Sequence, residues 1–225
     1  MPSARPTAPA PPLSGSRHAP LTVAIPKGRV TKALIPLFQR AGLDPASLAS
    51  DDRRLIRETA DGALRFLLLK PDDVPTYVEY GTAELGVCGR DVLRERAYDL
   101  YQPLELGVGK CRLVVAGPRD AHIPSVPRIA TKYPRIASEH FASRGIQAEI
   151  VFVQGSVELA PIVGLSDLIV DLVESGATLR DNDLVELETI CPISSVLIAN
   201  RSLFKLRHAE IQPLIERLRA AVLPE

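Results

Sequence analysis

The chain has 225 residues, 46% of them apolar and 24% charged, so it can bury a core as one large domain or as two small ones. Its 27 lysines and arginines balance its 27 acidic residues, which argues against a protein that coats nucleic acid. No apolar run approaches the ~20 residues of a membrane-spanning helix, so we expect a soluble protein that binds neither nucleic acid nor membrane.

Three cysteines, Cys88, Cys111 and Cys191, are widely spaced and form no CxxC pair. This pattern gives neither a disulfide framework nor a zinc site, and it suits a reducing cytosol. We therefore expect a cytoplasmic protein in which all three are small buried hydrophobic side chains. Arginine outnumbers lysine 21 to 6, which favours anion binding because guanidinium groups match phosphate oxygens. A compositional bias of the host is the alternative.

We expect residues 1–20 to form a disordered tail. They hold six prolines and almost no large apolar side chain, so they cannot bury enough surface to become ordered. The segment lacks the continuous apolar core of a secretory signal. The absence of acids before Asp44 resembles a transit peptide, but the prolines oppose an amphipathic helix, so targeting is the less favoured alternative.

From Leu21 the sequence alternates between expected strands and helices. The run at 63–69 is apolar throughout, as in a strand whose sheet is covered on both faces. Further strands are expected at 21–25 and 84–89. Helices are expected at about 30–41, ended by Gly42, at 74–80, capped by Asp72 or Asp73, and from Asp91 onward.

A second set of elements begins near Cys111. Strands are expected at 111–117, 127–131, 148–153 and 167–171, with a long strand pair through 184–199 and helices at 135–144 and 157–163. This alternation predicts an α/β fold with a mostly parallel sheet. A last amphipathic helix should cover about 203–222, bent or begun at Pro213. Its apolar face should hold Leu206, Ile211, Leu214, Ile215, Leu218 and Val222.

The segment 158–183 carries the clearest chemical pattern. A hydrophobic strand ends in Asp171 and leads into a stretch that holds Ser175, Gly176 and Thr178. Ligands of parallel α/β sheets bind beyond the carboxyl ends of strands, where such a loop can turn N–H groups and hydroxyls toward one anion. Asp171 could accept hydrogen bonds from a sugar or from the water shell of a metal. The pattern suggests a sugar-phosphate site but does not decide between it and an ordinary turn capped by Asp171.

Ten positions of this segment resemble, without departure, the signature of ATP phosphoribosyltransferases, the glycosyltransferases that open histidine biosynthesis. They are Glu158, Gly164, Ser166, Ile169, Asp171, Leu172, Ser175, Gly176, Thr178 and Leu179. The resemblance extends from about Leu21 to Leu223. It implies that the 5-phosphate of phosphoribosyl pyrophosphate is bound by Ser175, Gly176, Ala177, Thr178 and Leu179. Asp171 would then lie near the ribose, with Glu158 facing the sugar.

The same resemblance gives roles to two basic segments. Lys27, Gly28 and Arg29 follow the first strand directly, where two cations beside a glycine suit a polyphosphate. By resemblance, Arg29 neutralises the departing pyrophosphate with help from Lys27. Arg53, or Arg54 if the register slips, would act on the same group. From the residues alone, solvated charged loops are the default interpretation of both segments.

Four more residues follow predicted strand ends and line the substrate side in the resembling family. Asp91 would contact the adenine or the ribose, although a helix N-cap is the alternative. Lys132 could meet a phosphate and Tyr133 could stack on a ring, with packing of the tyrosine at a strand end as the alternative. Ser156 lies at the next strand tip, where a second sugar-binding turn would stand.

The resemblance also implies a fold and a reaction. The fold is a two-domain, periplasmic-binding-protein-like (type II) α/β fold with its active site in the interdomain cleft. Domain I would comprise 21–109 and 195–225, and domain II 110–194. Adenine N1 of ATP would attack C1 of phosphoribosyl pyrophosphate with inversion and loss of pyrophosphate. Such a reaction needs positioning and charge neutralisation, so Arg29 and Arg53 are the expected catalytic residues, and Mg²⁺ on the substrate phosphates is the expected cofactor.

The remaining features concern metals, partners and other functions. The four histidines, at 18, 122, 140 and 208, have no metal-ligand spacing, so no protein-held metal is expected. Long-form family members carry a further C-terminal domain that senses histidine. This chain ends soon after its last predicted helix, and so resembles the short form. That form works with a regulatory subunit similar to a histidyl-tRNA synthetase, in an expected hetero-octamer.

Two other classes of protein remain as alternatives. A solute-binding module shares the cleft architecture, but it is normally exported and no export signal is visible here. A ligand-sensing regulatory domain would need a DNA-binding or partner element, and none is visible. Turnover, rather than binding alone, separates the enzyme from a binding module.

Overall fold

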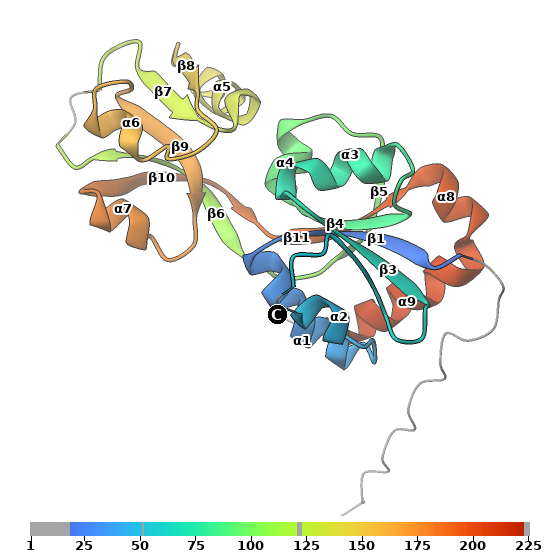
Figure 1. Cartoon of the computed structure of the whole chain (residues 1–225). Coiled ribbons are helices and arrows are strands. Elements are labelled where there is room, and N and C mark those ends of the chain that lie inside the picture. The colour runs from blue at the N-terminus through green and yellow to red at the C-terminus, as the bar shows by residue number, and fades with distance from the viewer. Residues whose placement is uncertain (1–18, 51, 121–122, 223–225) are drawn as a thin grey trace, which may run out of the picture. The chain divides into compact units, whose positions relative to one another are not determined.

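A computed structural model describes residues 19–50, 52–120 and 123–222, which form two compact units (Figure 1). The first unit comprises the described residues up to 88 together with 98–108 and 195–222. The second comprises 89–97 and 109–194. Each unit has a sheet and a hydrophobic core of its own.

The first unit is built on a six-stranded sheet. Its central strand β1 pairs in parallel with β3 and β4, while β2 runs antiparallel to β3 and β5 antiparallel to β11. In spatial order the strands are β2 (Ile56–Glu58), β3 (Leu64–Leu69), β1 (Leu21–Pro26), β4 (Leu85–Gly89), β11 (Ser195–Asn200) and β5 (Leu100–Glu105).

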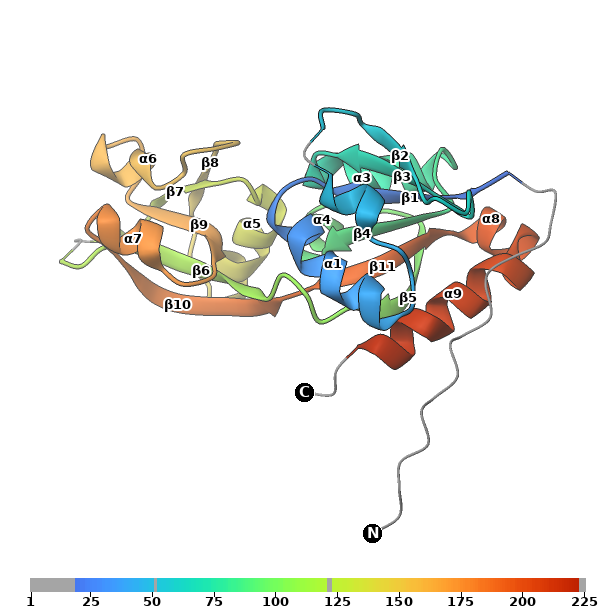
Figure 2. The ribbon, with the colours of Figure 1, turned by 60° about the horizontal axis from the view of Figure 1, so that its bottom comes forward.

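Helices cover both faces of this sheet. On one face α1 (Arg29–Arg40) and α9 (His208–Ala221) lie side by side (Figure 2) and bury apolar stripes in a common core. On the other face α3 (Val74–Glu79) packs close to β4, because Gly86 leaves no side chain between them. The shorter helices of the unit are α2 (Ala46–Ala49), α8 (Arg201–Leu206) and the 3-10 turn η1 (Pro71–Asp73).

The second unit has a five-stranded sheet with β7 in parallel contact with β8 and β9, and β6 antiparallel to β9 and β10. Separate apolar clusters cover its two faces. The strands in spatial order are β10 (Leu184–Ile193), β6 (Cys111–Pro118), β9 (Leu168–Val173), β7 (Arg128–Thr131) and β8 (Glu149–Phe152). The helices are α4 (Arg90–Glu95), α5 (Pro134–Ser143), α6 (Leu159–Ile162) and α7 (Ala177–Asp181).

Most predicted elements are present within a residue or two of their expected bounds, and the α/β class is confirmed. The prediction of a mostly parallel sheet was only half right, because both sheets are mixed. The first is parallel around β1 and antiparallel at its edges, whereas the second is parallel from β9 through β7 to β8 and antiparallel from β9 through β6 to β10. The strand pair expected through 184–199 is two strands in two different sheets. Strands β2 and β5 were not predicted, because short edge strands with exposed charged or polar residues lack a clear alternation.

The C-terminal helix also differs from its prediction. It is broken at Arg207 rather than at Pro213, which stays inside α9. The Arg207 guanidinium donates to Glu84 at 2.7 Å and to Glu210 at 2.5 Å, and so fixes the chain where α8 ends. Leu206 is 79% exposed, so its assignment to the apolar face was wrong. The residues of that face that are buried are Ile211, Leu214, Ile215 and Leu218.

One expected domain boundary differs from the structure. Residues 89–97, expected in domain I, belong with the second unit, because the Glu95 carboxylate accepts the backbone N–H groups of Arg135 and Ile136 at 2.9 and 3.1 Å. The tail expected over residues 1–20 lies outside the described residues up to residue 18. Asp73 precedes α3 as expected, but its side chain makes no capping hydrogen bond.

Candidate functional site

In the second unit the parallel strands β7, β8 and β9 bring their carboxyl ends to one edge of the sheet. Thr131, fully buried at the end of β7, donates through its hydroxyl to the Val170 carbonyl at 2.7 Å and accepts from the Tyr133 N–H at 2.9 Å. This bridge fixes the end of β7 beside the residue before Asp171. The segments that follow β7 and β9 therefore start from a rigid base.

The segment after β9 holds the predicted phosphate loop. Gly176 has φ 73°, the left-handed region that a residue with Cβ adopts only at a cost. The Ser175 hydroxyl accepts from the Ala177 N–H at 3.3 Å, and Arg180 donates to the Ser175 carbonyl at 3.0 Å. Residues 177–179, expected in a loop, instead form the first turn of α7. N–H groups of a first turn have no acceptor inside the helix, so they suit an anion.

Arg112 holds the start of this loop from the neighbouring strand β6. Its guanidinium donates to the Glu174 carbonyl at 3.1 Å and forms an ion pair of 2.5 Å with Glu186 on β10. The exposed side chains of Ser175 and Thr178 therefore extend from a segment whose two ends are tied down.

Asp171 is partly buried within β9, two residues before the strand ends. The pKa of its carboxyl is raised from 3.8 to about 6, chiefly by burial and also by the nearby charges of Glu158 and Asp91. The Leu172 N–H, 2.8 Å from Oδ1, and the charge of Lys132 oppose that rise. Three carboxylates and one lysine of the second unit thus influence one another electrostatically.

Asp91 lies in the first turn of α4 and is only 6% exposed. The Tyr133 hydroxyl donates to its Oδ2 at 2.9 Å. Burial raises the pKa of the Asp91 carboxyl, and the hydrogen bond from Tyr133 limits the rise. The helix N-cap is Gly89, where a Cβ would stand 2.0 Å from Asp91 Oδ1. Glycine at 89 is therefore needed for Asp91 to hold this position.

The other predicted site residues of the second unit differ in how far they are exposed to solvent. The Tyr133 ring is 3% exposed and packs in the core, so the structure gives it the task of holding Asp91 rather than a free face for stacking. Lys132 is half-buried, with Nζ 5.9 Å from the centre of that ring. Glu158 is the half-buried N-cap of α6, and Ser156 is exposed with a φ of 50°.

In the first unit, Lys27, Gly28 and Arg29 form the turn from β1 into α1, with exposed side chains. Gly28 has φ 94°, which favours glycine. The Thr31 hydroxyl donates to the Pro26 carbonyl at 2.5 Å, and the Lys27 N–H donates to the Leu69 carbonyl at 2.8 Å. The turn is thus anchored on both sides, and its cations are directed outward.

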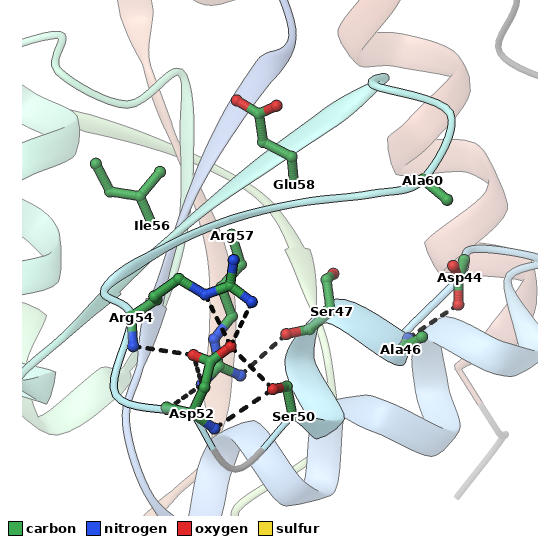
Figure 3. Close-up of a pocket in the computed structure, with 10 residues that line it drawn as sticks. All are labelled: Asp44, Ala46, Ser47, Ser50, Asp52, Arg54, Ile56, Arg57, Glu58 and Ala60. Carbon is green, nitrogen blue, oxygen red and sulfur yellow. Dashed lines mark hydrogen bonds and ion pairs between the residues drawn. The ribbon is translucent and has the colours of Figure 1, made fainter.

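The second basic segment precedes β2 and borders a cavity of about 640 Å³ (Figure 3). Arg54 donates to the Asp52 carboxylate through Nε at 2.9 Å and Nη2 at 2.7 Å. These bonds lower the pKa of Asp52 to about 2. Arg53 is exposed, and within the described part of the chain its side chain has no recorded hydrogen bond or ion pair. Of the two arginines left open by the sequence, Arg53 is the one whose charge is not already matched.

His140 and the three cysteines are wholly or partly buried. His140 is buried, and Arg144 and Glu188 flank it. Cys88 is buried and the other two cysteines are partly buried, all with free thiols. Among the described residues, no group of three or more His, Cys, Asp or Glu side chains could hold a metal ion, and no helix is long and apolar enough to cross a membrane.

Two residues that matter here were missed in the sequence. Gly89 was placed at a strand end and in the G-x-D turn that leads to Asp91, but the sequence did not show that a Cβ at 89 would displace the Asp91 carboxylate. Thr131 was read as an ordinary strand residue, and nothing in its local sequence indicates its bond to the Val170 carbonyl.

Comparisons with known sequences agree with one another. A family model described as ATP phosphoribosyltransferase matches residues 70–220. An ATP phosphoribosyltransferase of Sorangium cellulosum is 66% identical over 202 residues, which cover 90% of this chain and 96% of that protein. One from Acidithiobacillus ferrooxidans is 48% identical over 211 residues, which cover 91% and 98%.

Solved structures resemble the whole chain. An ATP phosphoribosyl transferase (HisG:HisZ) complex from Thermotoga maritima has a chain that matches with a TM-score of 0.76 and 36% identity, over 90% of this chain and 98% of that one. The periplasmic VFT2 domain of Bordetella pertussis BvgS matches with a TM-score of 0.60 and 15% identity, over 92% and 89%, a likeness of fold alone. The expected periplasmic-binding-protein-like fold is confirmed by these likenesses.

Proposed function

The chain belongs to the ATP phosphoribosyltransferase family, and from that membership we propose that it transfers the phosphoribosyl group of phosphoribosyl pyrophosphate to N1 of ATP. The products are N1-(5-phosphoribosyl)-ATP and pyrophosphate, and the reaction is the first step of histidine biosynthesis. The observation that carries this function is the 66% identity over nearly the whole length of a protein with that activity in its name.

The reaction develops opposite charges at the two ends of the breaking bond. A bond forms between adenine N1 and ribose C1, while the bond from C1 to the pyrophosphate oxygen breaks and its electron pair leaves with that oxygen. Positive charge grows on the ribose and negative charge on the leaving group. The protein therefore needs fixed charges of both signs rather than a nucleophile.

The second unit provides the groups proposed for the ribose 5-phosphate. The turn of Ser175, Gly176 and Ala177 and the first turn of α7, with Thr178 and Leu179, offer N–H groups and two exposed hydroxyls. Asp171 and Glu158 are proposed to accept from the ribose hydroxyls, and Ser156 to add a contact at the end of β8. The negative charges of Asp171 and Glu158 also suit a ribose that becomes positive.

The first unit provides the cations proposed for the pyrophosphate. Arg29 and Arg53 are proposed as the catalytic residues that neutralise its growing charge, and Lys27 and the Gly28 backbone assist. Support comes from the exposed position of these cations, and from the contrast between Arg53 and its neighbour Arg54, which Asp52 already neutralises. A guanidinium matches two phosphate oxygens at once, which suits a diphosphate that leaves as one group.

Asp91 and Lys132 are proposed for the nucleotide. The Asp91 carboxylate can accept from the ribose or from the adenine amino group, and Lys132 can meet a phosphate. Tyr133 supports Asp91 through its hydroxyl. Its part in the substrate site is therefore proposed to be indirect.

Mg²⁺ is proposed to enter with the substrate phosphates. The ion is proposed to be held mainly by phosphate oxygens. Bound there, Mg²⁺ supplies positive charge to the pyrophosphate.

A regulatory partner and a cytoplasmic location are part of the proposal. This chain covers 98% of the chain in the Thermotoga maritima HisG:HisZ complex, which supports the short form of the enzyme. We propose that it assembles with a regulatory subunit that resembles a histidyl-tRNA synthetase, in a hetero-octamer. Histidine should inhibit the assembly but not the isolated chain, and size-exclusion chromatography with and without the partner measures the association.

The direct test of the function is a product assay. The purified chain is mixed with ATP, phosphoribosyl pyrophosphate and Mg²⁺, and N1-(5-phosphoribosyl)-ATP is measured by mass spectrometry. Reactions that lack one substrate are the controls. Binding of both substrates without this product, with or without the regulatory subunit, would favour a binding protein over the enzyme.

A further inference from the structure

Arg57 is an arginine buried beneath an exposed loop. It lies in β2, four residues after Arg53, and its side chain is 8% exposed, whereas that of Arg54 is 79% exposed. A guanidinium is costly to remove from water unless its donors are paired. Nη1 and Nη2 of Arg57 are both paired, whereas its Nε is buried without a hydrogen-bond partner among the described residues, so the bonds of the two Nη atoms must offset its burial.

The partners of Arg57 are backbone carbonyls from two segments (Figure 3). Nη1 donates to the Ser47 carbonyl at 2.9 Å. It also donates to the Leu48 carbonyl at 3.3 Å, and both carbonyls belong to α2. Nη2 donates to the Asp52 carbonyl at 2.7 Å. The last carbonyls of a helix lack partners inside the helix, and a cation there is favourable. One side chain thus joins α2, β2 and the loop between them.

Asp52 closes the same loop from the other side. Its carboxylate accepts from the Arg54 N–H at 2.9 Å, from the Ser50 hydroxyl at 3.1 Å, and forms an ion pair of 3.3 Å with Arg57. The two sequence neighbours of Arg53 are therefore both held by hydrogen bonds. Arg53 itself extends from this closed turn with an exposed side chain.

We propose that Arg57 is a positioning residue of the transfer reaction, which ties residues 52–54 to α2 through Asp52 and so fixes the place of Arg53. This inference rests on the proposed role of Arg53 at the leaving pyrophosphate. A displacement of about an ångström in a group that stabilises a transition state can cost about a hundredfold in rate. The cavity of about 640 Å³ beside the loop gives it room to move when the bonds of Arg57 are lost.

A double-mutant cycle separates positioning from a general structural role. The variants are Arg57→Gln, Arg53→Ala and the two together, and kcat and both KM values are measured at saturating Mg²⁺. Arg57→Gln should lower kcat by about ten- to a hundredfold and change the KM for ATP little. In the Arg53→Ala background, the same change should lower kcat less than threefold, because the group that Arg57 positions is already gone.

Two further variants serve as controls. Arg65→Gln removes an arginine from the adjacent strand β3 that pairs with Glu58 in an exposed position, and it should keep wild-type kcat. Arg57→Lys keeps the charge but not the fork of donors, so it should lose part of kcat while it remains folded by circular dichroism. This variant carries the same cycle with Arg53→Ala if Arg57→Gln does not fold.

The measured losses of kcat either support or overturn the positioning role of Arg57. Equal losses of kcat from the change at 57 in both backgrounds would overturn positioning, since Arg57 would then act independently of Arg53. Unchanged kcat in folded Arg57→Gln, or in Arg57→Lys where only that variant folds, would overturn it as well. Wild-type kcat in Arg53→Ala would instead remove the proposed role of Arg53, and the positioning inference with it. The two failures are therefore distinguishable.

Discussion

The acidic and the basic parts of the proposed site are built in different ways. In the second unit, Asp91, Asp171 and Glu158 lie within or beside regular elements and are at least partly buried. In the first unit, Arg29 and Arg53 stand at a helix start and on a loop, with exposed side chains. The acids are thus placed by strands and helices of the second unit, whereas the cations lie at a turn and on a loop.

This difference decides what each part is sensitive to. Burial raises the pKa of Asp91 and Asp171, so their negative charge depends on pH. Arginines keep their charge at every pH of interest, so the basic part depends instead on where its turns hold the guanidinium groups. The acidic part should respond to pH and to small changes of the core, and the basic part to loss of charge and of loop geometry.

The largest effect is expected from Arg53→Ala. Removal of one group that stabilises transition-state charge costs about 10²- to 10³-fold in kcat, and the KM for ATP should change far less. Steady-state kinetics with each substrate varied in turn measures both. Arg54→Ala is the matched control, because Asp52 already neutralises that neighbour. Unchanged kcat in Arg53→Ala would remove it from the mechanism, and an equal loss in Arg54→Ala would contradict the choice between the two arginines.

Asp171→Asn should have the next largest effect. Loss of a charged acceptor at the ribose should lower kcat/KM for phosphoribosyl pyrophosphate by about ten- to a hundredfold. In the wild type, the same parameter should fall as the pH drops through about 6, where Asp171 becomes protonated. The pH profile should lose that inflection in the variant. An unchanged inflection would assign it to another group.

The same substitution should stabilise the fold, with a definite pH dependence. The pKa of Asp171 is raised from 3.8 to about 6 in the native state, so the native state binds the proton more tightly than the unfolded chain does. The penalty of the charged form grows between these pH values and is complete above about 6. Asp171→Asn should therefore gain on the order of 2 kcal/mol above pH 6 and little below pH 4, as measured by urea unfolding.

Gly89→Ala tests how the acidic part is held. The new Cβ would stand 2.0 Å from Asp91 Oδ1, so the carboxylate must leave its place beside Tyr133. The KM for ATP should rise several-fold, up to about tenfold, the worth of one or two hydrogen bonds. Tyr133→Phe removes only the hydroxyl and should raise the pKa of Asp91 further, with a smaller change in KM. Wild-type kinetics in both variants would remove Asp91 from the nucleotide site.

Gly176→Ala should have the smallest effect of the series. A side chain in the left-handed conformation costs about 1–2 kcal/mol, and the new Cβ meets Arg180 Nη1 at 3.2 Å, an atom that can move. We expect the KM for phosphoribosyl pyrophosphate to rise several-fold with kcat nearly unchanged. Gly145→Ala is the control, since that glycine has a similar φ and lies outside the proposed site. A larger loss in the control would mean that the effect is one of stability.

The same contrast explains how much the sequence could predict. The strands and most helices followed from the spacing of apolar residues, and Asp171 and the segment after it followed from a strand that leads into a Ser-Gly-Thr stretch. These are local patterns, in which neighbouring residues carry the information. The acidic part is built largely of them.

What the sequence could not predict depends on contacts between distant residues. The pairing of Tyr133 with Asp91 joins positions 42 apart, and the bond of Thr131 to the Val170 carbonyl joins positions 39 apart. Strand β2, with its one buried arginine, was not recognised because the sequence around it carries many charges. The choice between Arg53 and Arg54 needed the position of Asp52, which no periodicity gives.

Titration of inorganic pyrophosphate in the presence of Mg²⁺ tests the division of charge most directly. Isothermal calorimetry would compare the wild type with Arg53→Ala and Asp171→Asn. If the cations of the first unit hold the leaving group, Arg53→Ala should weaken pyrophosphate binding by about tenfold or more, the loss of one charge-assisted hydrogen bond. Asp171→Asn should bind it as tightly as the wild type. Equal affinity in wild type and Arg53→Ala, with weakened binding in Asp171→Asn, would contradict the account.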